Sequence, residues 1–214
     1  MTDRAVIAYL RGEDVRGRFC ESLLAIALEG PEPKPVVLSL EWGPNLSTGR
    51  NRLVDDFLRR HSEPWLLMVD TDMVLPLDVL PRLIAAAHPV ERPVVGALCY
   101  TLERGEQQPT MYELTRKDSG ELAFARPASW PADACVRVSA TGTACLLMHR
   151  DALLAVEKTS KDPAAPWFRE TAVGGKLALM GEDLTFCLRC AAAGIPVHVH
   201  TGVKAGHMKT TMLI

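Results

Sequence analysis

Short apolar runs alternate along the chain with longer stretches in which apolar residues recur every three or four positions. The runs have the length of buried strands, and the spaced stretches have the period of amphipathic helices. The predicted strands cover residues 5–10, 35–40, 65–69, 94–100, 136–139, 144–149 and 197–199. The predicted helices cover residues 17–28, about 48 to 60, 77–87, 151–157 and 181–193. Strands that alternate with helices predict an α/β fold with a mostly parallel sheet flanked by helices.

The apolar positions also indicate which face each helix buries. In the first helix, one face is expected to bury Phe19, Leu23, Leu24, Ala27 and Leu28. The second helix is expected to bury Leu53, Val54, Phe57 and Leu58. Ser47 or Thr48 is the predicted N-cap of the second helix, and Gly194 is the predicted end of the last one.

Residues 101–134 break this alternation. The segment is polar, contains three prolines and shows no sustained period. A stretch of that length inside a domain is usually a functional flap, a hairpin insertion or a lid. It carries four basic residues, Arg104, Arg116, Lys117 and Arg126.

Composition narrows the class of protein. With 214 residues, 48% of them hydrophobic, the chain is long enough for one domain with a full core. A formal net charge of −2 gives no global basic field for nucleic acid or an anionic membrane. The apolar run at 5–10 is too short for a signal sequence or a membrane span, so we expect a cytoplasmic protein without a transmembrane segment.

The six cysteines are expected to be reduced and buried, because most lie in apolar segments. Cys187 and Cys190, followed by His198 and His200, suggest zinc, but the spacing fits no usual zinc finger. Cys187 and its helical neighbours form an apolar stripe, which favours burial in the core. The two histidines are expected to pack or bond to backbone. Among the aromatic residues Trp130, Trp167 and Phe168, we favour a pocket position for Trp167 over a core position.

Two pairs of acidic residues carry the candidate chemistry. Asp70 and Asp72 follow the apolar run at 65–69. Alternate residues of an extended chain point the same way, so the two carboxylates are expected to share one divalent cation at the carboxyl end of a strand. Glu182 and Asp183 open a helix, where the helix dipole favours the ionised carboxylate. A solvated turn is the alternative for the first pair, and simple helix capping is the alternative for the second.

Four segments together resemble the GT-A glycosyltransferases, in particular the family 2-like transferases that include compact bacterial and phage enzymes. The segments are residues 47–52 at the start of a helix, residues 67–73, residues 181–183, and Gly206-His207 near the C-terminus. The resemblance extends over most of the chain. It implies a single GT-A domain with a Rossmann-like, mostly parallel sheet, in which residues 1–100 bind a nucleotide sugar and residues 101–214 bind the acceptor and carry catalysis. The polar segment 101–134, with its four basic residues, is then expected to form the surface that faces the acceptor.

The resemblance also implies a cofactor and residue roles. A bound Mn²⁺ or Mg²⁺ would neutralise the charge that builds on the departing diphosphate. Asp72 is implied as a direct metal ligand, Asp70 as a contact to the ribose or to a metal-bound water, and His207 as a further ligand. Lys209 would meet the diphosphate. Asp183, beside Glu182, would be the general base of an inverting displacement. For His207, the alternative is a surface position on a frayed tail.

Donor recognition is expected at the ends of the first two strands and at the start of the second helix. The resemblance places Arg11, Gly12, Glu41, Arg50 and Asn51 there, with Arg50 near phosphate or nucleobase. The first strand ends in Leu10-Arg11-Gly12, whereas related transferases commonly have a Pro-Thr-type turn. The nucleobase therefore stays open.

The sequence thus predicts a metal-dependent glycosyltransferase that uses a nucleotide-diphosphate sugar. A sugar-nucleotide-forming nucleotidyltransferase is one alternative, although the Gly-rich basic loop expected after its first strand is absent. A non-catalytic nucleotide- or sugar-binding module is the other. The acceptor is left as a glycan or lipid-linked precursor, a protein, or a modified DNA base, and the oligomeric state is open.

Overall fold

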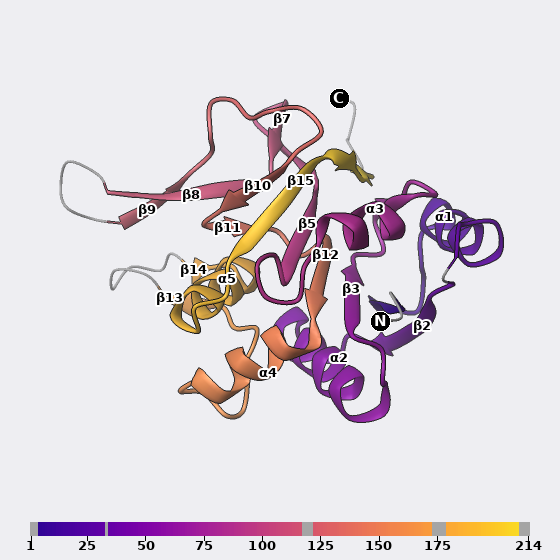
Figure 1. Ribbon diagram of the computed structural model, residues 1–214, viewed down its shortest axis with the longest axis horizontal. Helices are drawn as coiled ribbons and strands as arrows, with labels where there is room; N and C mark the ends of the chain where they lie inside the picture. The colour runs from indigo at the N-terminus through magenta and orange to yellow at the C-terminus, as the bar shows by residue number, and fades with distance from the viewer. Residues whose placement is uncertain (1–3, 33, 117–121, 173–178, 210–214) are drawn as a thin grey trace.

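A seven-stranded sheet forms the centre of the computed structural model, which describes residues 4–32, 34–116, 122–172 and 179–209 (Figure 1). The strand order is β10-β15-β5-β12-β3-β1-β2. The bounds are β1 Ala5–Arg11, β2 Val36–Glu41, β3 Trp65–Val69, β5 Val94–Leu98, β10 Cys135–Val138, β12 Cys145–His149 and β15 Val197–Lys204. Strands β1, β2, β3, β5 and β15 run in one direction, and β10 and β12 run against them. The predicted α/β fold is confirmed.

Five helices of the described chain cover the two faces of the sheet. They are α1 Gly17–Leu28, α2 Leu46–Arg60, α3 Val79–Ala86, α4 Arg150–Thr159 and α5 Glu182–Ala192. Successive residues of a strand face opposite sides. Ile7 belongs to the same buried cluster as Phe19 of α1 and Leu83 of α3, whereas Val6 belongs to the cluster that contains Phe57 of α2 and Phe186 of α5. Helices α1 and α3 therefore lie on one face, and α2, α4 and α5 lie on the other.

The predicted burial was partly wrong for α1. Phe19, Leu23 and Ile26 are buried, but Leu24 is 58% exposed and Leu28 is 74% exposed. The buried stripe follows i, i+4 and i+7, which turns Leu24 and Leu28 away from the sheet. In α2 the prediction holds better: Leu53, Val54 and Phe57 are fully buried, and Leu58 is partly buried.

The start of α2 also differs from the prediction. The N-cap is Asn45, whose Oδ1 accepts a hydrogen bond of 2.8 Å from the Thr48 N–H, so neither Ser47 nor Thr48 is the cap. Gly49 allows this first turn to lie against the sheet edge. A Cβ atom there would come within 2.7 Å of both Leu10 Cδ1 and Trp42 O, so the close approach requires glycine. Residue 50 is thereby brought to the carboxyl ends of β1 and β3.

The irregular segment is a hairpin insertion, one of the predicted possibilities. Strands β6 Tyr100–Glu103 and β7 Glu106–Pro109 form one hairpin, and β8 Met111–Arg116 and β9 Leu122–Ala125 form another. Strand β8 also pairs with β11 Ala140–Thr141. In Figure 1 the second hairpin extends away from the central sheet. Lys117 lies outside the described residues.

Two further strand pairs complete the described fold. Strand β4 Met73–Val74 pairs with β16 Gly206–His207, and β13 Thr171–Ala172 pairs with β14 Leu179–Met180. The last long strand, β15, continues to Lys204, beyond the predicted end at Val199, with an irregular register between His200 and Lys204. None of the helices within the described residues is long and apolar enough to cross a membrane.

All six cysteines are free thiols. Cys99, Cys145, Cys187 and Cys190 are buried as predicted, but Cys20 is exposed and Cys135 is only partly buried. Cys187 Sγ lies 3.5 Å from the Thr141 carbonyl oxygen and Cys190 is fully buried, so both thiols belong to the core beneath α5. Burial raises the pKa of Cys187 to about 12, which keeps this thiol protonated. This agrees with the predicted core position.

Candidate active site

The carboxyl end of β3 places Asp70 and Asp72 in a tight turn. Strand β3 ends at Val69, and the Met73 N–H donates to the Asp70 carbonyl at 3.2 Å. The chain is therefore not extended through Thr71, so the extended backbone from which the shared cation site was predicted is wrong. Each carboxylate instead has its own partners. The prediction that one cation takes both carboxylates stays a prediction.

Asp72 is held by the C-terminal segment. The Met208 N–H donates to the Asp72 carbonyl at 2.8 Å, next to the β4–β16 pairing. His207 Nε2 lies 2.9 Å from Asp72 Oδ2, and Lys209 Nζ lies 3.2 Å from the same oxygen. The expected alternative of a frayed tail is wrong up to Lys209. Residues 210–214 lie outside the described part of the chain.

The ring of His207 has a defined orientation. Its Nδ1 lies 2.7 Å from the Tyr100 carbonyl oxygen, which can only accept, so Nδ1 carries a proton and donates it. Nε2 is therefore the nitrogen that faces Asp72. The hydrogen bond with Asp72 raises the pKa of His207 although burial opposes it. Burial alone would raise the pKa of Asp72, but the hydrogen bonds and charges of His207 and Lys209 outweigh it and lower that pKa to about 2.

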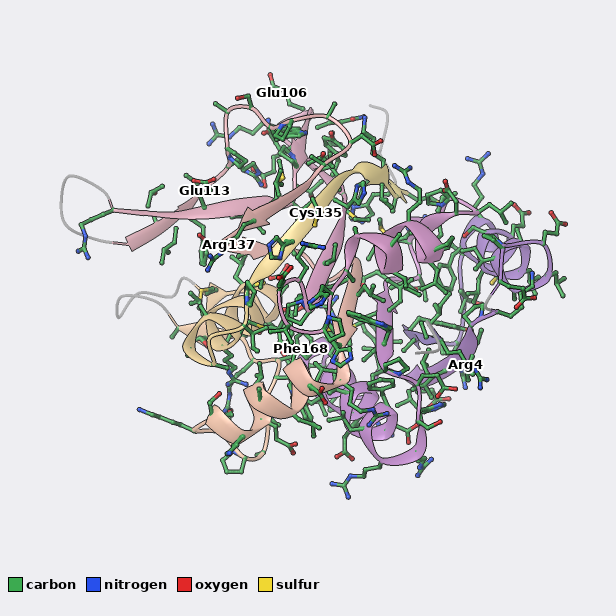
Figure 2. The ribbon with its side chains drawn as sticks, in the orientation of Figure 1. Arg4, Glu106, Glu113, Cys135, Arg137 and Phe168 are labelled. Atoms are coloured by element: carbon green, nitrogen blue, oxygen red, sulfur yellow. The ribbon has the colours of Figure 1, made fainter. Side chains whose placement is uncertain are left out.

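Arg50 joins the two acidic pairs. The side chain is only 4% exposed, its Nη2 lies 2.9 Å from Asp70 Oδ1, and its Nη1 donates to Glu182 Oε1. The guanidinium also lies 6.0 Å from the centre of the Phe168 ring, which is buried in the interior (Figure 2). Arg50 thus ties α2 to the end of β3 and to the start of α5. The structure places it between two carboxylates, whereas the sequence prediction had placed it against a nucleotide.

Of the two acidic residues at the start of α5, Asp183 is the one that forms no ion pair with Arg50. Glu182 is paired with Arg50, whereas Asp183 Oδ1 accepts a hydrogen bond of 2.7 Å from the Leu184 N–H. Burial raises the pKa of Asp183, and the charge of Glu182 adds to this, while the Leu184 bond and Arg50 oppose it. Gly181 makes room for the carboxylate, because a Cβ there would lie 2.8 Å from Asp183 Oδ1. A partly buried carboxylate with a raised pKa is suited to accept a proton.

Part of this site lines a cavity of about 340 Å³, whose lining does not include Asp72 or Lys209. Five of the predicted site residues line it: Arg50, Asp70, Glu182, Asp183 and His207. The remaining walls come from the hairpin insertion and the loop before β12, and sequence reasoning did not single these residues out. They include Thr101, Glu103, Thr110, Tyr112, Gly142 and Thr143. The polar character of the insertion was the one feature of the sequence that could have indicated these lining residues. No local pattern shows that they lie in the same cavity as Asp183.

The other predicted donor residues lie outside the lining of this cavity. Arg11 and Glu41 are register partners on β1 and β2 and form an exposed ion pair of 3.5 Å, with Gly12 next to them. Asn51 is 8% exposed, and all its polar groups are occupied by backbone. Its amide accepts from the Trp167 and Phe168 N–H groups and donates to the Ser47 and Phe168 carbonyls. Asn51 anchors a loop, which is a correction to its predicted place in donor binding.

The structure also shows the surroundings of the aromatic residues and histidines that were singled out in the sequence. Trp167 is 2% exposed and its indole N–H donates to the Leu153 carbonyl, so most of the side chain packs in the core. Trp167 also lines a separate cavity of about 530 Å³ beside the start of α2, and its role in a pocket stays a prediction. Phe168 stacks on Phe186 in the same core. His198 is buried, and His200 accepts from the Gly202 N–H, as expected of packed histidines. Within the described ranges, no three side chains of the His, Cys, Asp or Glu types converge as a complete metal site.

Comparisons with known proteins establish the fold. No protein-family model matches the chain, and no curated protein matches its sequence. Similar solved structures include A197 from STIV, with 17% identity, a TM-score of 0.56, and coverage of 97% of this chain and 86% of that one. They also include GalNAc-T7 with UDP, GalNAc and Mn2+, with 12% identity, a TM-score of 0.57, and coverage of 96% and 44%. The chain spans less than half the length of GalNAc-T7. At these identities the likeness establishes a GT-A-like fold, and the family 2 level stays a prediction.

Proposed function

We propose that this protein transfers a sugar from a nucleoside-diphosphate sugar to a hydroxyl group, with Mn²⁺ or Mg²⁺ as cofactor. The observation that carries the proposal is the pairing of Asp72 Oδ2 with His207 Nε2 at 2.9 Å, near the cavity that also holds Asp183. A GT-A-like neighbour solved with UDP and Mn2+ supports it. The chain then acts as one transferase domain, with the donor bound mainly by residues 1–100 and the acceptor and catalytic base supplied by residues 101–214.

The residues near Asp72 fit a divalent cation of this kind. Mg²⁺ and similar ions are commonly held by one or two protein ligands together with substrate phosphates. Asp72 supplies a carboxylate oxygen, and Nε2 of His207 is oriented toward it because Nδ1 is fixed on Tyr100. Lys209, on the same carboxylate, is near enough to meet a diphosphate. When bound, the cation would neutralise charge on the leaving diphosphate.

The chain's own groups account for the remaining chemistry. Asp183 accepts the proton of the acceptor hydroxyl while the acceptor oxygen bonds to the anomeric carbon of the sugar. The bond from that carbon to the diphosphate breaks, and its electron pair stays on the diphosphate oxygen. Attack opposite to the leaving group inverts the sugar configuration. Arg50 is a positioning residue, because it fixes Glu182 and therefore the start of α5 that carries Asp183.

Nucleotide binding tests this proposal. Calorimetry with UDP, GDP, ADP and CDP should find at least one ligand whose affinity falls by roughly tenfold or more when EDTA replaces Mn²⁺. Asp72→Ala should give the same loss while the far-UV circular dichroism spectrum is unchanged. Asp78→Ala, which removes an exposed acid at the start of α3, is the matched control and should bind normally. Equal affinity with and without the metal would contradict the proposal.

A further inference from the structure

The insertion and the start of α5 both contribute to the lining of the cavity. Glu103 at the end of β6 and Tyr112 on β8 line the cavity together with Asp183. Tyr112 and Asp183 line the same cavity, and burial is the main cause that raises the pKa of Tyr112. The phenol therefore remains protonated at neutral pH. A hydrogen-bond donor and a carboxylate thus line the same cavity as the proposed base.

Arg126 fixes both groups. Its Nε donates to the Pro109 carbonyl at 2.9 Å, and Nη1 and Nη2 donate to the two oxygens of Glu103, with Nη1 at 3.2 Å. The guanidinium lies 5.2 Å from the centre of the Tyr112 ring, and Nη2 donates to the Tyr112 oxygen at 3.4 Å. Because the phenol oxygen accepts from Arg126, its own proton is left to donate. A carboxylate that accepts from arginine twice retains two further acceptor positions, so Glu103 can still accept.

The charge around this wall is negative. Four carboxylates line the cavity, those of Asp70, Glu103, Glu182 and Asp183, and the basic side chains in its lining are Arg50 and His207. Arg50, His207 and the nearby Arg126 are each already engaged by a carboxylate. The insertion as a whole, residues 101–134, contains six acidic and four basic residues. Figure 2 shows Glu106 and Glu113 on its two hairpins. Phosphate groups are bound by unpaired cationic side chains, so this wall disfavours a phosphorylated or nucleic-acid acceptor.

We propose that the acceptor is an uncharged carbohydrate whose neighbouring hydroxyls are held by Tyr112 and Glu103 while a third group, Asp183, faces the reacting hydroxyl. Tyr112 donates to one acceptor oxygen, and Glu103 accepts from an adjacent hydroxyl. The proposal rests on the proposed function for the role of Asp183, and it narrows the acceptor to a neutral polyhydroxyl compound. The proposal also changes the expected role of the insertion. Arg126 holds Glu103 and Tyr112 in place, and these two side chains, rather than the arginine, contact the acceptor.

Saturation-transfer NMR tests the proposal directly. The ligands are methyl glycosides of glucose, galactose, mannose and N-acetylglucosamine, their 6-phosphates, and a short DNA duplex, each with and without UDP and Mn²⁺. At least one neutral glycoside should bind. Its affinity should fall about three- to tenfold in each of the two single variants, Tyr112→Phe and Glu103→Gln. The controls are Tyr9→Phe, a ring packed on Phe19 away from the cavity, and Glu106→Gln on the same hairpin. Both should bind like the unmodified protein.

Three results would overturn the proposal. These are binding of no neutral glycoside, tighter binding of a sugar phosphate or of DNA than of any neutral glycoside, and equal glycoside affinity in the two cavity variants and the two controls. The nucleotide measurement separates this outcome from failure of the proposed function. If UDP binds only with Mn²⁺ but no glycoside binds, the acceptor proposal alone fails. If glycosides bind as described but no nucleotide does, the acceptor site stands and the transferase proposal fails.

Discussion

Replacing Asp183 by asparagine is expected to lower sugar transfer by roughly 10²-fold or more, because the amide cannot accept the proton of the acceptor hydroxyl. Asparagine keeps the shape of the side chain and an oxygen that can accept the Leu184 N–H. Nucleotide binding should therefore persist. The measurement is the initial rate of transfer once a donor and an acceptor are identified. Asp151→Asn, which changes an exposed acid in the first turn of α4, is the matched control.

The pH dependence follows from the raised pKa of Asp183. The base must be ionised, so kcat/KM should fall as the pH drops through a pKa above the ordinary value for aspartate, about 3.9. The effect on stability has the opposite sign. Because burial raises the folded-state pKa, ionising Asp183 disfavours the folded state, and this penalty develops as pH rises from the unfolded pKa to the folded one.

The asparagine variant should therefore have a higher melting temperature than the unmodified protein at neutral pH and should lose that advantage in acid. Near-normal turnover in Asp183→Asn would remove Asp183 from the mechanism. A variant that is slower but no more stable at neutral pH would instead contradict the account of its burial.

Replacing Arg50 by alanine is expected to destabilise the fold by about 3–5 kcal/mol, because it leaves the buried Glu182 carboxylate without a partner. For a chain of this size, each kcal/mol lowers the melting temperature by about 2–4 °C, so a fall of about 6–20 °C is expected. Differential scanning calorimetry measures it. Arg52→Ala, an exposed arginine on the same helix, is the control and should change stability by no more than about 0.5 kcal/mol.

Arg50 is a positioning residue, so its removal should also alter the pH profile of any activity that survives. Arg50 lowers the pKa of Asp183, so the acidic limb of kcat/KM should move to higher pH in a folded Arg50→Met variant. An unchanged profile, or a loss of stability no larger than that of Arg52→Ala, would show that Arg50 does not connect the two acidic pairs.

Local patterns predicted most of the elements. The apolar runs at 65–69 and 94–98 became fully buried strands, because a run without polar interruption has no solvent-facing side. Helix α1 was predicted with its observed bounds, but its buried face was predicted only in part, since Leu24 and Ile26 are equally apolar in sequence. Which of them meets the sheet depends on how the helix is placed against β1 and β3. That placement is a tertiary property.

In the candidate site too, some features follow from the local sequence and others depend on tertiary contacts. Asp72 was predicted as a site residue from its position after a strand, and Asp183 from its position at the start of a helix; their roles stay predictions. The ion pair of Arg50 with Glu182 could not, because 132 positions separate the two residues and neither segment alone requires the other. Asn51 was misassigned for a related reason. Its neighbours along the chain suggest a ligand site, while its actual partners are backbone groups of Trp167 and Phe168.

The metal position is the most direct test of the account. Crystals grown with UDP and Mn²⁺, measured at the manganese absorption edge, should show one anomalous peak bonded to an Asp72 carboxylate oxygen, His207 Nε2 and the nucleotide diphosphate. That peak should be absent from crystals of Asp72→Ala grown in the same way. UDP bound with no manganese at Asp72, or manganese bound with the diphosphate at a different set of side chains, would contradict the claim that Asp72 and His207 form the metal site of a glycosyltransferase.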